Sequence, residues 1–225
     1  MRSLIVLFIV CFYFQSGLAQ HSIKLDVDGT KLTNAEFRKK WTNEQLNLYA
    51  WQYKGEDGNN YIELRKGLFE TSVQDFDSIR SLFKKIYNVK IPKKHVILLE
   101  YRFKDDMCTT ESRDNKWTKS ELDYKVAFAN GTRSELKSEG VTYITLFEND
   151  IILESHSNKK GEYFFNDIDN FFRNNLFKTP SLCGSYALIK PNGETLVRNG
   201  EYNAEFMAEH LKSEIWNRFF NKEGN

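Results

Sequence analysis

The sequence predicts a mixed α/β protein with a central sheet and flanking helices. Residues 183–198 have the pattern of a β-hairpin, with an apolar strand, a Pro-Asn-Gly turn at 191–193 and a second strand. Proline fixes φ at the start of such a turn, and Asn-Gly tolerates the positive φ that tight hairpins need. The aliphatic run at 95–103 is typical of a strand buried on both faces. A helix capped by Asn203 comes directly after the hairpin.

Residues 20–91 are expected to form a β-α-β-β-α extension that precedes the central sheet. Alternating apolar and polar residues at 23–27 predict a short strand. Thr33 and Glu36 form the pattern of a capping box, so a helix is expected over 34–41.

The rest of this extension consists of two strands and a helix. Residues 46–53 and 61–65 alternate as strands do, and the segment between them has the Gly, Asp and Asn content of a hairpin loop. Ser72 and Asp75 are expected to open the second helix. The seven residues 88–94 then join it to the central strand. Because this join is short and poor in Gly and Ser, we expect the extension to pack against residues 92–225 as one folding unit.

Helices and strands alternate after residue 95. We expect a helical segment within 112–139 that is interrupted or ended at Gly131 and Gly140, then a strand over 141–147. Apolar spacing predicts a helix over 164–176. After the hairpin, a final helix is expected to pack on the sheet through a stripe at intervals of four: Met207, Leu211, Ile215 and Phe219.

The first nineteen residues have the features of a secretory signal peptide. Arg2 supplies the positive start, residues 4–14 are apolar, and the small residues Gly17 and Ala19 stand at the −3 and −1 positions of a cleavage before Gln20. We therefore expect a secreted protein, periplasmic or extracellular. After cleavage no hydrophobic stretch of spanning length remains, so no membrane span is expected.

Composition and motifs argue against several functional classes. Loss of Arg2 with the signal peptide leaves 31 basic and 31 acidic residues, whereas a nucleic-acid-binding protein normally carries a basic excess. The four histidines show no metal-ligand spacing, so no metal site is expected. The chain also has no Gly-x-Ser-x-Gly motif of hydrolases and no pattern that calls for a cofactor.

Two cysteines remain after the signal peptide, which contains Cys11. Cys108 comes after the central strand and Cys183 precedes the hairpin. In an exported protein such a pair is a candidate disulfide, with two separate buried thiols as the alternative.

The order of elements from residue 95 onward, β-α-β-α-β-β-α, resembles the thioredoxin-like fold. The segment Ala-Leu-Ile-Lys-Pro-Asn-Gly-Glu at 187–194 is similar to the strand and Asp-Pro-Asp-Gly hairpin of exported thioredoxin-like and peroxiredoxin-like proteins. The resemblance implies a thioredoxin-like domain over residues 92–225. It also implies that Cys108 and Cys183 lie side by side, as a disulfide or as facing thiols, because the strands that carry them would be neighbours.

This chain departs from the family's catalytic pattern at the residues that matter. The family places a reactive cysteine at the start of the first helix, with a second cysteine three residues later and a cis-proline before the hairpin strand. Cys108 stands near the first position, but Glu111 takes the place of the second cysteine. Gly184 takes the place of the proline, and Ser185 comes next.

Two functional hypotheses arise from these departures. The favoured hypothesis is a non-catalytic binding or structural role on a thioredoxin-like scaffold, with an unidentified protein or small molecule as partner. The alternative is a thiol–disulfide oxidoreductase that uses Cys108 with Cys183 and a site loop formed by Glu111, Gly184 and Ser185. Fold alone does not choose between them.

Overall fold

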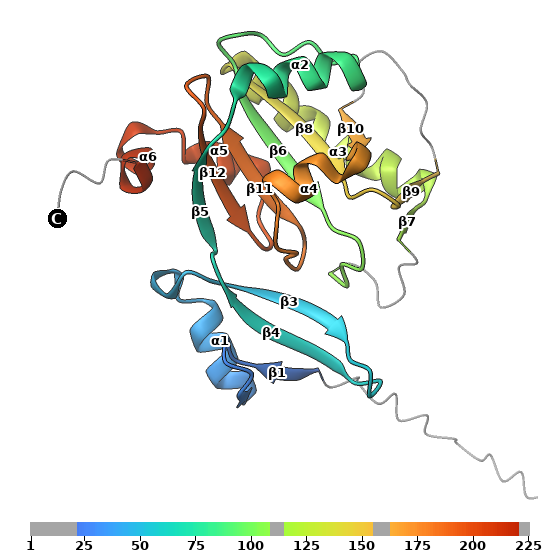
Figure 1. Cartoon of the computed structure of the whole chain (residues 1–225), viewed down its shortest axis with the longest axis vertical. Coiled ribbons are helices and arrows are strands. Elements are labelled where there is room, and N and C mark those ends of the chain that lie inside the picture. Colours follow the sequence, from blue (N-terminus) through green and yellow to red (C-terminus); the bar gives the residue numbers. More distant parts are fainter. Residues whose placement is uncertain (1–21, 109–114, 155–162, 221–225) are drawn as a thin grey trace, which may run out of the picture.

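The computed structural model describes residues 22–108, 115–154 and 163–220. Figure 1 shows a six-stranded sheet with helices on both faces and, below it, a separate four-stranded sheet with one helix. The expected signal peptide (residues 1–19) and Glu111 lie outside the described residues.

The six-stranded sheet has the strand order of a thioredoxin-like core. β6 lies between β8, which is parallel to it, and β11, which is antiparallel, and β12 pairs antiparallel with β11. This arrangement confirms the predicted fold class. In spatial order the strands are β10 (Phe164–Asn166), β8 (Val141–Phe147), β6 (Val96–Arg102), β11 (Ser185–Ile189), β12 (Glu194–Asn199) and β5 (Phe69–Val73).

Helices bury both faces of this sheet. Successive side chains of β6 point to opposite faces, so Leu99 packs with α2 (Phe76–Ile86) and α4 (Phe171–Asn175). Leu98 packs on the other face, with α3 (Lys119–Ser138), α5 (Ala204–Glu209) and α6 (Ser213–Phe220). The prediction of a central strand covered on both faces is therefore confirmed.

The smaller sheet has its own core. Its strand order is β2-β1-β4-β3, and Phe37 of α1 packs against Leu48, Ala50 and Leu64. The capping box of Thr33 and Glu36 begins α1, as predicted. The elements are β1 (Ile23–Leu25), β2 (Lys31–Leu32), α1 (Asn34–Trp41), the 3-10 turn η1 (Glu44–Leu46), β3 (Leu48–Lys54) and β4 (Asn60–Lys66).

Strand β5 connects the two sheets. The chain leaves β4, turns at Gly67 and enters β5, which pairs antiparallel with β12 at the edge of the large sheet. The expectation that Ser72 opens a helix was wrong, because Ser72 lies in β5 opposite Thr195. Asp75 is the N-cap of α2, and its side chain accepts the main-chain N–H of Ser78.

Two of the predicted helices have different boundaries. The prediction of a helix over 164–176 was wrong, since Phe164 and Phe165 belong to β10, which pairs with β8. A 3-10 turn, η2 (Ile168–Asn170), comes next, and α4 begins only at Phe171 because the Asp167 carboxylate accepts the main-chain N–H groups of Phe172 and Arg173. The expected interruption at Gly131 was also wrong, because α3 is continuous through this exposed residue.

The final helix is divided in two. Asn203 caps α5 as predicted, but the chain turns at residues 210–212 before α6 begins. Met207 and Trp216 are buried, whereas Leu211 is only partly buried. A short parallel pair, β7 (Lys116–Trp117) and β9 (Ile152–Leu153), completes the described elements.

Candidate functional site: the disulfide and the adjacent cavity

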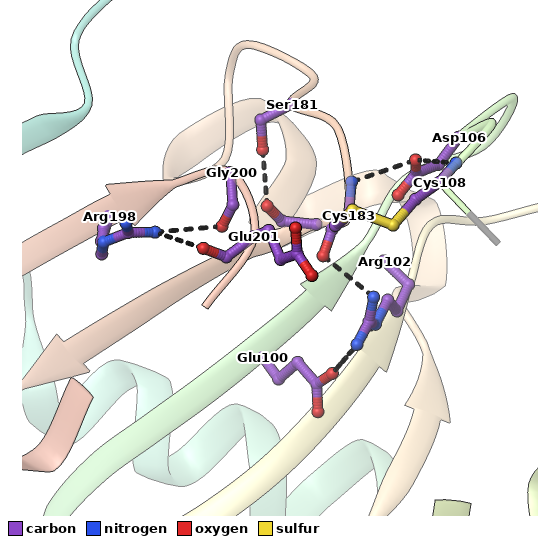
Figure 2. The surroundings of a disulfide bond; sticks show 10 residues. Glu100, Arg102, Asp106, Cys108, Ser181, Cys183, Arg198, Gly200 and Glu201 are labelled. Atoms are coloured by element: carbon purple, nitrogen blue, oxygen red, sulfur yellow. Dashed lines mark hydrogen bonds and ion pairs between the residues drawn. A yellow bond between two sulfur atoms is a disulfide. The ribbon is translucent and has the colours of Figure 1, made fainter. Parts of the chain in front are cut away.

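A disulfide joins Cys108, which lies after β6, to Cys183, which precedes β11 (Figure 2). Their Cα atoms are 4.9 Å apart although 75 residues separate them in the sequence. β6 and β11 are neighbours in the sheet, so the topology brings the two cysteines together. The predicted proximity of Cys108 and Cys183 is confirmed, and the bridged form is the one present.

One carboxylate holds both cysteines. Oδ1 of Asp106 accepts the main-chain N–H of Cys108 at 3.0 Å and that of Cys183 at 3.1 Å, as the dashed lines of Figure 2 show. An anion is thus fixed beside the disulfide.

The residues after Cys183 serve the packing of the loop. Gly184 has φ +87°, and a Cβ atom there would lie 2.5 Å from the carbonyl oxygen of Tyr101. Ser185 is fully buried, and its hydroxyl donates to Oδ1 of Asn199 on β12 at 2.7 Å. Cys108, Cys183 and Gly184 therefore meet at one place, while the Ser185 hydroxyl is engaged between strands.

The first described helix after β6, α3, begins at Lys119, later in the chain than Cys108. Thr118 and Glu121 form its capping box. The Thr118 hydroxyl accepts the main-chain N–H of Glu121, and Glu121 in turn accepts the N–H of Thr118. The main-chain N–H groups of Thr118 and Glu121 therefore donate to side chains of the capping box itself.

Arg102 donates both to the carbonyl oxygen of Cys183 and to a buried carboxylate, that of Glu100. Glu100 is 1% exposed and accepts hydrogen bonds from four side chains of β6, α3 and β8. The donors are Arg102 (Nε at 2.9 Å), Lys125 (Nζ at 2.7 Å), Tyr143 (2.5 Å) and Thr145 (3.0 Å).

Burial and the two cations act in opposite directions on the Glu100 carboxyl. Burial by itself would raise the pKa of Glu100, but the charges of Lys125 and Arg102 and the hydrogen bonds of Lys125 and Tyr143 outweigh burial. They hold the pKa of Glu100 well below its usual range. Burial lowers the pKa of Lys125 by removing water from the ammonium, and the charge of Arg102 lowers it further; the anion Glu100 raises the pKa but does not outweigh burial.

A cavity of about 520 Å³ opens beside this cluster. Its walls come from β6, β8, β11, α3 and the segment that starts α5. The lining includes the charged cluster and aromatic side chains, among them Glu100, Arg102, Trp117, Tyr124, Lys125, Phe128, Tyr143, Tyr186 and Tyr202.

Sequence reasoning missed this cavity, although one signal was present. Glu100 and Arg102 share one face of a strand that is otherwise aliphatic or aromatic and was expected to be covered on both faces. Charged residues are rarely buried without a paired partner, so such a pair marks a polar site inside the core.

Comparisons with known proteins leave the family unassigned. No family model matches the chain, and no curated protein matches its sequence. The crystal structure of the exposed lipoprotein thioredoxin of Streptococcus pneumoniae is similar at 9% identity and a TM-score of 0.36. The match covers 72% of this chain and 98% of that protein.

The described residues contain neither a metal-binding cluster nor a membrane-spanning helix. Among them, no group of three or more His, Cys, Asp or Glu side chains is placed to hold a metal ion. Within the same residues, none of the helices combines the length and apolar character needed to cross a bilayer.

Proposed function

We propose that this protein is an exported, non-catalytic binding protein on a thioredoxin-like scaffold, and that its disulfide is structural. The observation that carries the proposal is the carboxylate of Asp106, bonded to the main chain of both Cys108 and Cys183. The bound partner is a small molecule or a protein.

The chemistry of thiol exchange explains why this carboxylate matters. The reactive species is a thiolate, which helix N-termini and nearby cations favour. A carboxylate beside the sulfur atoms disfavours a thiolate and raises the pKa of a thiol. The capping box of Thr118 and Glu121, meanwhile, occupies the start of α3. The surroundings of Cys108 therefore suit a stable bridge better than a reactive thiol.

Export is part of the same proposal. A disulfide persists in oxidising compartments such as the periplasm or the extracellular space. The signal-peptide pattern of residues 1–19 supports the same location.

The test is an assay of disulfide exchange. The reduced protein is mixed with insulin and a small amount of dithiothreitol, and the rate of insulin reduction is measured. We expect insulin to be reduced no faster than by dithiothreitol alone. A faster rate that Cys108→Ser abolishes would contradict the proposal.

A second candidate function is thiol–disulfide oxidoreduction. It is supported by the position of the cysteine pair at the carboxyl end of β6, beside the loop before β11, where the resemblance implies redox chemistry. The Cys108 thiolate would attack a substrate disulfide and release one substrate thiolate, and Cys183 would then displace the second. The insulin assay distinguishes this function from the first.

A further inference from the structure

We propose that the cavity beside Glu100 binds a small amphipathic monoanion with an aromatic or other apolar body and one carboxylate or sulfonate group. This inference rests on the proposed binding function and names its site and ligand class.

The size suits a small molecule. Cavities that bind small ligands usually measure about 300–1,000 Å³, are largely apolar and contain a few convergent polar groups. This cavity measures about 520 Å³ and combines aromatic side chains with the cluster around Glu100.

The mouth carries two aromatic side chains that the fold itself leaves exposed. Tyr124 is 74% exposed and Phe128 is 77% exposed. They stand four residues apart on α3, and their rings stack with centroids 6.4 Å apart. Exposed apolar patches of this kind mark binding sites, and a flat apolar ligand can lie against these rings.

The interior of the cavity has one cation in excess. Glu100 is the single anion of the buried cluster, and it faces both Arg102 and Lys125. Arg102 directs its guanidinium to Glu100 and to the carbonyl oxygen of Cys183. The Lys125 ammonium has three N–H groups, and among the described residues its hydrogen-bond partner is Glu100. Lys125 is therefore the group that can donate to an anionic ligand.

The mouth also has two carboxylates, which limit the charge of the ligand. Glu121 and Glu205 line the cavity. Glu121 caps α3, and Glu205 accepts the hydroxyl hydrogen of Thr132 at 2.6 Å. Glu205 is exposed and Glu121 is partly exposed, and both carboxylates would repel a ligand with several negative charges. The combination selects a single anionic group that passes the mouth and reaches Lys125.

The experiment uses two probes that differ by one sulfonate. 1-Anilinonaphthalene-8-sulfonate has an aromatic body and one negative charge, and N-phenyl-1-naphthylamine has the same rings without the charge. Their dissociation constants for the purified protein are measured by fluorescence. We expect the sulfonate to bind at least tenfold more tightly than the neutral probe.

Variants then locate the site. Lys125→Met should weaken binding of the sulfonate about tenfold and change that of the neutral probe less than twofold. The control Lys119→Met removes a charge from the same helix at a residue outside the cavity lining, and should change neither. Phe128→Ala should weaken the binding of both probes about fivefold, whereas Phe171→Ala on α4 should leave the binding of both unchanged. If Lys125→Met lowers the unfolding midpoint, Lys125→Gln is measured in its place.

Several outcomes would overturn the inference. If Lys125→Met weakened binding of both probes equally, the charge of Lys125 would have no role in binding. If Lys119→Met weakened binding of the sulfonate as much as Lys125→Met does, the sulfonate would be attracted by surface charge in general. Binding that is unaffected by both Lys125→Met and Phe128→Ala would place the probe elsewhere. The insulin assay on the same samples separates the two proposals, because exchange activity would refute the non-catalytic role and leave the ligand site standing.

Discussion

Arg102 donates a hydrogen bond of 2.9 Å from Nη1 to the main-chain carbonyl oxygen of Cys183. The same guanidinium pairs with Glu100 through Nε and Nη2. Figure 2 shows these bonds leaving Arg102 in two directions, toward the disulfide loop and toward the buried carboxylate. One side chain therefore connects the disulfide with the wall of the cavity.

The first prediction concerns this connection. Arg102→Met should lower the free energy of unfolding by about 3–5 kcal/mol, because it removes one partner of a buried ion pair and leaves the carbonyl of Cys183 without its donor. Urea denaturation measures the loss. Lys119→Met, which breaks the exposed pair with Asp123, should cost less than about 1 kcal/mol. Similar costs for the two variants would show that the buried network is not integral to the fold.

The second prediction is a pH dependence due to Glu100. Its pKa is depressed in the folded protein relative to the usual value of 4.5. The stabilisation is then complete above about pH 4.5 and is lost as the pH falls below it, because the unfolded state takes up the proton first.

Comparison with Glu100→Gln isolates this effect from other carboxylates. The stability difference between wild type and Glu100→Gln should be constant between about pH 6 and pH 8. It should shrink by up to about 1.4 kcal/mol per pH unit below pH 4. Urea denaturation at each pH provides the values, and a difference that stays constant down to about pH 3 would contradict a depressed pKa.

The third prediction concerns the stability that the disulfide provides. A bridge across 75 residues is expected to stabilise by about 4.5 kcal/mol in the chain-entropy model and commonly by about 2–4 kcal/mol in practice. The double variant Cys108→Ser/Cys183→Ser should lose that amount in urea denaturation. Dithiothreitol should destabilise the wild type and leave the double variant unchanged, and an equal effect on both would exclude the bridge as the cause.

The fourth prediction is that residues 20–91 and 92–225 unfold together. The join between them is fixed, since Arg80 donates from Nε and Nη2 to the carbonyl oxygen of the buried Ile91. β5 pairs with β12, and Nδ2 of Asn199 donates to the carbonyl oxygen of Gly67 at 2.7 Å. Limited proteolysis should release no pair of stable halves by a cut near Pro92. Two separate unfolding transitions would show independent domains instead.

The elements that the sequence predicted well are those with local signals. The capping box of Thr33 and Glu36 and the turn at 191–193 depend on residues within a few positions of each other. β5 and β10 were missed because their partners are distant in the sequence. Pairing with β8 outweighed the helix predicted to start at residue 164, and pairing with β12 outweighed the capping pattern at Ser72.

The site divides in the same way. The cysteine pair could be predicted, because the thioredoxin-like resemblance implies a strand order in which the ends of β6 and β11 lie side by side, as they do here. The cavity could not, since its walls come from five separate segments whose packing no local pattern encodes. The predicted stripe of the last helix is confirmed only in part. Met207 is buried in the core, but the turn at 210–212 divides the helix, and Leu211 and Phe219 pack against the core only partly buried.

The last prediction concerns Gly184, which stands where the resemblance places a cis-proline. Its φ of +87° disfavours any other residue, and an added Cβ would lie 2.5 Å from the carbonyl oxygen of Tyr101, a main-chain atom of the central strand. Gly29 offers a matched control, because it has φ +83° with no atom within 4 Å of the added Cβ. Gly29→Ala should therefore cost only the strain of positive φ, about 1–3 kcal/mol.

Gly184→Ala should cost that strain and about 1–3 kcal/mol more, because β6 must move away from the new methyl group. The free energies of unfolding of both variants in urea test the difference. Equal losses would mean that the loop before β11 can shift without disturbing β6. In that case the close approach of Gly184 to Tyr101 would not be what fixes the Cys183 side of the disulfide.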